Sequence, residues 1–213
     1  MQYIFLHGMG QTASSWDKTL SCLPTAIEAS VPELSSFFTA EGSSYNNIYA
    51  SFCEYCGSFP EPVSLCGLSL GAVLALNYAI DFPKRVSSLI LVAPQYKMPK
   101  LLLKVQNVLF QFMPERQFAN IGFQKKDFIS LTNSMADLDF TKNLDRVTCP
   151  VLVLCGEKDS ANSKAARGLA DRLPNAHFKA IGQSGHEVNV ENPKDLARAI
   201  TEMCHETRNR PAH

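Results

Sequence analysis

The sequence lacks an excess of charge of either sign, because 20 basic side chains balance 20 acidic ones among its 213 residues. This balance argues against a protein that binds nucleic acid through a basic face. It also lacks a long apolar run. The run over residues 1–6 is far shorter than the roughly 20 residues that span a bilayer, and no basic segment precedes it. We therefore expect a protein without an export signal or a membrane span.

The seven cysteines are an odd number, in a chain long enough to be stabilised by apolar burial. This favours a reduced, cytoplasmic protein. Cys53 and Cys56 form a C-x-x-C motif, but a structural zinc site needs a second ligand pair, and none follows at that spacing. We expect the two thiols to share one face of a helix, and we expect no metal and no cofactor; metal or redox use is the alternative.

Strand-like and helix-like segments alternate along most of the chain, a pattern typical of an α/β protein with a mostly parallel sheet. With 46% hydrophobic residues, one core is expected. About six strands are predicted, at residues 3–6, 34–38, 63–66, 86–93, 151–155 and 177–181. Helices are predicted at residues 16–22, 48–56, 70–80, 163–173 and 193–205, followed by a frayed tail.

The alternation stops between about residues 96 and 145, where the sequence instead carries a strongly apolar helical segment, residues 100–113. We predict that residues 1–95 and 146–213 form one discontinuous core and that residues 96–145 are an insert.

A G-x-S-x-G motif at residues 67–71 points to a nucleophilic serine, Ser69. In this motif the serine sits on a tight turn between a strand and a helix, and the glycines allow the backbone to pass closely around it. An apolar strand precedes the motif here, and a helix rich in small residues follows it. The alternative is a serine that merely caps the helix.

A serine hydroxyl needs a base, and the base needs an acid that orients it. Asp159 follows one predicted strand and His186 follows the next. Because parallel strands end at the same edge of a sheet, Ser69, Asp159 and His186 are expected to converge there. As alternatives, Asp159 is a helix cap with Glu157 as the acid, or His186 is a loop or capping residue.

The segment His7-Gly8-Met9-Gly10-Gln11 follows the first predicted strand. With this segment and the three motifs above, the chain resembles the α/β-hydrolase superfamily, in particular its small cap-bearing esterases, lipases and carbon-carbon hydrolases. The resemblance implies a catalytic triad of Ser69, Asp159 and His186. It also implies that the backbone N–H groups of Met9 and Leu70 form the oxyanion hole, with a structural role for His7.

The sequence departs from the family pattern because it begins at the strand before the His-Gly segment, without the two antiparallel strands that usually precede it. We therefore expect a short sheet with one uncovered edge. Two alternatives would cover this edge: a homo-oligomer, or a chain terminus that folds against it.

The insert lies where this superfamily places its cap. We expect apolar side chains of the insert to bind substrate, namely Leu102, Val105, Leu109, Phe110 and Phe112. The alternative is that they only pack the cap. Four cations, Lys97, Lys100, Lys104 and Arg116, are interpreted as a solvated face, with a site for a substrate anion as the alternative.

The expected function is that of a serine hydrolase that cleaves a carboxylic ester or thioester of a small, largely apolar acyl group through an acyl-enzyme. Its expected partner is that small-molecule substrate, with a homo-oligomer as a further alternative. A carbon-carbon bond hydrolase, a lyase or a haloperoxidase would present the same elements, because one fold supports many chemistries. A non-catalytic ligand-binding receptor is the alternative of a different class.

Overall fold

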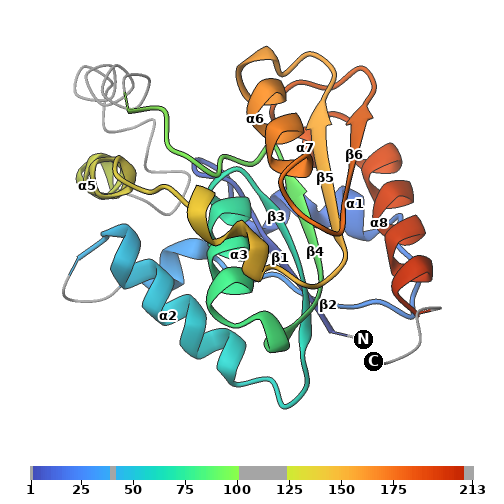
Figure 1. The fold of residues 1–213 in the computed structure, drawn as a ribbon, viewed down its shortest axis with the longest axis horizontal. Coiled ribbons are helices and arrows are strands. Elements are labelled where there is room, and N and C mark those ends of the chain that lie inside the picture. Colours follow the sequence, from blue (N-terminus) through green and yellow to red (C-terminus); the bar gives the residue numbers. More distant parts are fainter. Residues whose placement is uncertain (1, 39–41, 101–123, 209–213) are drawn as a thin grey trace.

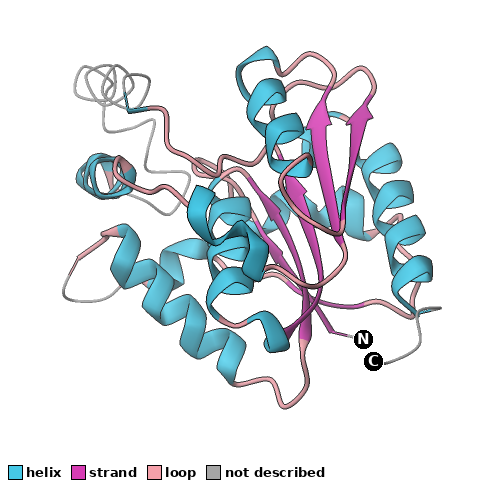
Figure 2. Cartoon of the chain, viewed as in Figure 1, coloured by secondary structure: helices cyan, strands magenta, loops and turns pink. Residues whose placement is uncertain are grey.

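The computed structural model describes residues 2–38, 42–100 and 124–208. They form a six-stranded sheet with helices on both faces (Figures 1 and 2). The strand order is β2-β1-β3-β4-β5-β6, and every neighbouring pair is parallel. The strands are β1 (Gln2–Leu6), β2 (Glu28–Ser30), β3 (Val63–Leu68), β4 (Val86–Val92), β5 (Val151–Gly156) and β6 (Ala176–Ile181).

In chain order, the α-helices of the described residues are α1 (Asp17–Leu20), α2 (Tyr45–Gly57), α3 (Leu70–Asp81), α5 (Lys125–Met135), α6 (Ser160–Ala170), α7 (Val188–Glu191) and α8 (Pro193–Arg208). Short 3₁₀ helices occur at Ala13–Trp16, Leu34–Phe37, Pro83–Arg85 and Thr141–Arg146. The predicted helix at residues 16–22 is thus a 3₁₀ turn followed by the single turn of α1.

The sheet separates two apolar clusters, one on each face. Successive side chains of β1 point to opposite faces and so belong to different clusters. Ile4 and Leu6 pack into the cluster that holds α2, α3 and α6, whereas Tyr3 and Phe5 pack into the cluster beneath α8. All four side chains are fully buried. A strand buried on both faces reads as a continuous apolar run, which is why β1, β3 and β5 were predictable.

One predicted strand is wrong. Residues 34–38 do not pair with the sheet; Leu34–Phe37 is a 3₁₀ helix whose Leu34 and Phe37 are buried three residues apart. On the side of β1 away from β3, the strand that pairs with it is Glu28–Ser30, at the edge of the sheet. It is short and largely solvent-facing, so no apolar pattern marked it.

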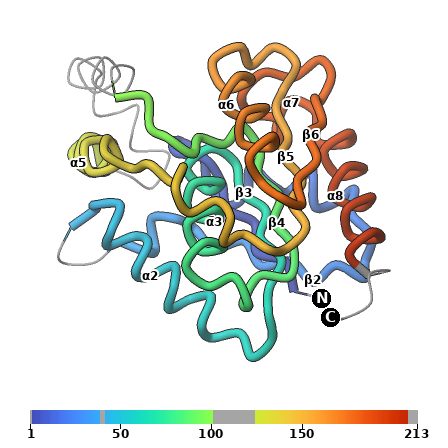
Figure 3. Tube along the Cα trace, viewed as in Figure 1, coloured from blue at the N-terminus to red at the C-terminus, as the bar shows by residue number. Residues whose placement is uncertain are grey.

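The ends of the predicted insert lie against each other. The N–H of Met98 donates to the carbonyl of Leu138, and the N–H of Phe140 donates to that of Tyr96. Beyond this bridge, α5 packs beside α2 (Figure 3). The cap at residues 96–145 stays a prediction. The helix at residues 100–113 and its side chains Leu102, Val105, Leu109, Phe110 and Phe112 lie outside the described residues, as do Lys104 and Arg116.

The helices in the described ranges include none that combines the length and the apolar character needed to cross a membrane.

Candidate active site

The three residues of the predicted triad follow three strands of the sheet, at the edge where the parallel strands end. Ser69 follows β3, Asp159 follows β5 and His186 follows β6. The three residues therefore lie at the same edge of the sheet.

Ser69 occupies a strained turn at the start of α3. Its φ of 53° and ψ of −111° lie where residues other than glycine are rarely found. Its N–H donates to the carbonyl of Val92 in β4 at 2.9 Å, which fixes the turn to the sheet. Strain of this kind costs on the order of 1–3 kcal/mol and recurs at functional sites.

The two glycines of the motif are required by close packing. A Cβ on Gly67 would lie 2.3 Å from the carbonyl of Gly71, and a Cβ on Gly71 would lie 2.3 Å from the carbonyl oxygen of Leu6. Both contacts are with backbone and cannot be relieved by turning a side chain. The glycines thus let β3, the turn and α3 pass beside β1.

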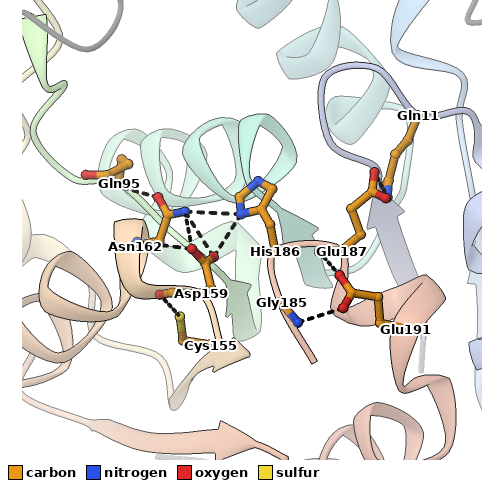
Figure 4. Close-up of polar contacts among 9 residues, drawn as sticks. All are labelled: Gln11, Gln95, Cys155, Asp159, Asn162, Gly185, His186, Glu187 and Glu191. Atoms are coloured by element: carbon orange, nitrogen blue, oxygen red, sulfur yellow. Dashed lines mark hydrogen bonds and ion pairs between the residues drawn. The ribbon is translucent and has the colours of Figure 1, made fainter. Parts of the chain in front are cut away.

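Asp159 and His186 are hydrogen-bonded. The Nδ1 atom of His186 lies 2.9 Å from Oδ2 of Asp159 (Figure 4). Asp159 is 6% exposed, so its carboxylate is sheltered from water, whereas His186 is half-buried. With Nδ1 held by the carboxylate, the other ring nitrogen, Nε2, is free to act on a substrate or a nucleophile.

Asn162, a residue that the sequence reasoning missed, lies against both members of this pair. Its Nδ2 lies 2.9 Å from each oxygen of Asp159 and 3.1 Å from Nδ1 of His186. Gln95 donates to Oδ1 of Asn162 at 2.8 Å and so directs the amide nitrogen toward Asp159 (Figure 4). In the tautomer with a proton on Nδ1, the imidazole and the amide both donate to the carboxylate.

Glu191 fixes the backbone of the loop that carries His186 through two hydrogen bonds. Its carboxylate accepts the N–H of Gly185 at 2.7 Å and the N–H of Glu187 at 3.1 Å (Figure 4). The backbone on both sides of His186 is therefore fixed by one side chain.

His7 is fully buried beneath the loop after β1. Its Nδ1 lies 2.9 Å from the carbonyl of Gly8, and its Nε2 accepts the N–H of Leu34 at 3.0 Å. Burial lowers the pKa of His7 below its ordinary value of 6.5, partly offset by the Gly8 carbonyl and by Glu33. A neutral imidazole that joins two loop segments fits the structural role expected for His7.

A cavity of about 190 Å³ lies over this edge of the sheet. Met9, Ser69, Leu70 and His186 all line it, so the structure brings the predicted nucleophile, base and oxyanion donors to one space. Leu70 is the first residue of α3, and its N–H has no acceptor within the helix. The rest of the lining, missed from the sequence, is Val73, Ala93, Gln95, Met98, Pro99, Thr132, Met135 and Asn162.

All seven cysteines are free thiols, and Cys53 and Cys56 lie one turn apart on α2, as predicted. Within the described ranges, no cluster of three or more histidine, cysteine or acidic side chains has the arrangement of a metal site.

Comparison with known proteins defines the class. Residues 3–199 match the alpha/beta hydrolase family, and the chain therefore belongs to it. The monoacylglycerol lipase ABHD6 of Homo sapiens is 21% identical over 94% of this chain and 74% of its own length. The pimeloyl-[acyl-carrier protein] methyl ester esterase of Vibrio parahaemolyticus is 28% identical over 86% of each.

Solved structures agree on the fold. A thermophilic esterase from Thermogutta terrifontis superposes with a TM-score of 0.77 at 20% identity, over 97% of this chain and 90% of the other. MenH from S. aureus superposes with a TM-score of 0.79 at 17% identity, over 98% and 95%. The protein is a hydrolase of the α/β-hydrolase family with esterase-like and lipase-like relatives.

Proposed function

We propose that the protein is a serine hydrolase that cleaves a carboxylic ester or thioester of a small, largely apolar acyl group. The observation that carries this proposal is the 2.9 Å contact between His186 and a buried Asp159, at a cavity that Ser69 also lines. Two of the relatives are named for ester substrates, a monoacylglycerol and a methyl ester, which favours this bond type.

In the proposed reaction, the Oγ of Ser69 attacks the carbonyl carbon while Nε2 of His186 takes its proton. The leaving alcohol or thiol receives that proton as the C–O or C–S bond breaks. Water then attacks the acyl-enzyme in the same way and releases the acid. Asp159 holds the imidazole in the tautomer that leaves Nε2 free to accept the proton.

The N–H groups of Met9 and Leu70 are proposed to bind the oxyanion of the tetrahedral intermediate. One such preorganised donor typically lowers the barrier by about 2.7–4 kcal/mol. The apolar lining from Val73, Met98 and Met135 suits a small apolar group on the substrate. No cofactor takes part in any of these steps.

The test is labelling with a fluorophosphonate probe, together with hydrolysis of nitrophenyl esters of graded chain length. Ser69→Ala is expected to abolish labelling and to lower kcat by about 10⁴- to 10⁶-fold. Ser58→Ala, an exposed serine at the end of α2, is the matched control. Labelling or near-normal turnover in Ser69→Ala would refute the mechanism and return attention to carbon-carbon hydrolysis, a lyase, a haloperoxidase or a receptor.

A further inference from the structure

A second and larger groove opens beside the candidate cavity. It encloses about 830 Å³ and shares Gln95, Met98 and Pro99 with the cavity, so the two spaces adjoin the same segment of chain. One wall is the segment that follows β4, and the other is a face of α6, at the same end of the sheet (Figure 1). The floor along α6 is made of small residues, Ala161, Ala165 and Gly168.

The groove carries a concentration of positive charge in a chain whose net charge is zero. Lys164, Arg167 and Arg172 lie along it from α6 and the turn beyond, at spacings of three and five residues. All three are exposed, and none forms an ion pair with an acidic side chain in the part of the chain that the structure describes. Asp171 is the one carboxylate of the lining.

The surroundings hold two of these cations in position. The guanidinium of Arg172 lies 5.5 Å from the ring centre of Tyr96, across the groove, and that of Arg167 lies 4.3 Å from the ring of Phe178. The fourth cation, Lys97, is already paired with Asp139 at 3.0 Å. Lys164, Arg167 and Arg172 therefore supply the positive charge of the groove, and with Asp171 on the same lining these four side chains carry a net charge of +2.

The volumes of the cavity and the groove indicate how a substrate would be divided between them. Ordinary small-molecule sites enclose roughly 300–1,000 Å³. The cavity at Ser69 encloses about 190 Å³, enough for the reacting ester and a small group, so a substrate of ordinary size would extend beyond it. The adjoining groove offers that space, with cations along it.

We propose that this groove binds the distal, anionic end of the same ester or thioester substrate, a phosphate or a carboxylate, while the scissile bond lies at Ser69. The proposal rests on the proposed function and narrows its substrate class: the reacting group is small and apolar, and the substrate as a whole is an anion. The cations involved are those of α6 and the turn after it, not those of the predicted cap helix.

The experiment compares matched ester pairs that differ in one charge. The first pair is the nitrophenyl ester of an ω-carboxy acid against that of the ω-carboxamide of equal length. The second is the acetyl ester of a phosphorylated alcohol against that of the same alcohol without phosphate. The ratio of kcat/KM within a pair, measured on one enzyme sample, is independent of the fraction of active enzyme.

The anionic member of at least one pair is expected to be preferred by about tenfold, the size that three exposed cations acting together supply. The triple variant Lys164→Gln, Arg167→Gln, Arg172→Gln is expected to bring the ratio close to one. Raising the salt from about 0.02 to about 0.3 M should reduce the wild-type preference, because exposed charges are screened. Lys18→Gln, an exposed lysine on α1, is the control and is expected to keep it.

Ratios near one for both pairs in the wild type, or a preference that survives in the triple variant, would overturn the inference while leaving the serine hydrolase intact. Absence of turnover for every ester, together with no labelling of Ser69, would refute the proposed function and this inference with it. The two failures are therefore distinguishable.

Discussion

Asn162→Ala removes the side-chain amide that lies between Gln95 and the Asp159–His186 pair. In the structure this amide makes two contacts of 2.9 Å with the carboxylate of Asp159. The backbone N–H of residue 162, which also donates to Oδ1 at 3.2 Å, remains in the variant. The change therefore loosens one side of the carboxylate without removing its N-terminal capping of α6.

A hydrogen bond to a charged group contributes about 1.5–3 kcal/mol, and each 1.36 kcal/mol of barrier is about tenfold in rate. If the amide acts by orienting Asp159 against His186, kcat is expected to fall by about 10- to 100-fold. KM is expected to change as well, because Asn162 lines the cavity.

The assay measures kcat and KM for a short and a longer nitrophenyl ester. A positioning role lowers kcat by a similar factor for both esters, whereas a role in substrate contact alone changes KM and depends on the ester. Ser163→Ala, the next residue on α6, is the control. A kcat within about threefold of the wild type for both esters would refute the positioning argument.

Three further outcomes are expected. Asp159→Asn should lower kcat by about 10⁴-fold, by analogy with the serine-protease aspartate, whereas Glu157→Gln should have little effect; the reverse result in steady-state kinetics would reassign the acid. Gly71→Ala should lower the free energy of unfolding by roughly 1–3 kcal/mol or more, because its Cβ would lie 2.3 Å from the Leu6 carbonyl oxygen, and an unchanged Tm would contradict this. Burial lowers the pKa of His7, so below about pH 6.5 the unfolded chain binds more protons than the folded one. The free energy of unfolding should therefore decrease as the pH drops below that value. Denaturant titrations at two pH values should show a smaller decrease in His7→Gln than in the wild type.

The fold was largely predictable because buried parallel strands carry continuous apolar runs. Val63–Leu68 and Val151–Gly156 are buried at every position, and both were recognised. Glu28–Ser30 was missed because an exposed edge strand of three residues has no apolar pattern. Leu34–Phe37 was mistaken for a strand because its apolar residues fit a short strand as well as one 3₁₀ turn.

The candidate site was predictable where a local motif or the end of a strand marked it, as for Ser69, Asp159 and His186. Asn162 lies three residues after an aspartate that caps a helix, and this spacing predicts a hydrogen bond between the two. The spacing does not predict the contact of Asn162 with His186. Gln95 lies 67 residues from its partner Asn162. Contacts of this range depend on how the sheet edge brings loops together, which no short pattern encodes.

The loop after β1 is joined by a pair of buried amides to α7, the short helix that follows the loop carrying His186. Asn189, fully buried, donates to Oε1 of Gln11 at 3.1 Å, and Nε2 of Gln11 donates back to Oδ1 of Asn189 at 3.2 Å. The same Oε1 accepts the N–H of Gly8 at 3.2 Å. Met9, the proposed oxyanion donor, follows Gly8, and the proposed base His186 lies three residues before Asn189.

Moving either segment alone would leave buried amide groups without partners, at about 1–3 kcal/mol for each. A shift of the segment that carries the proposed oxyanion donor is therefore opposed by the segment that carries the proposed base. A shift of the base is opposed by the oxyanion segment for the same reason. Because this coupling involves only core residues, the geometry of the proposed chemistry is fixed by the sheet and its loops. The proposed anion groove and the predicted cap could then differ in substrate choice without disturbing this geometry.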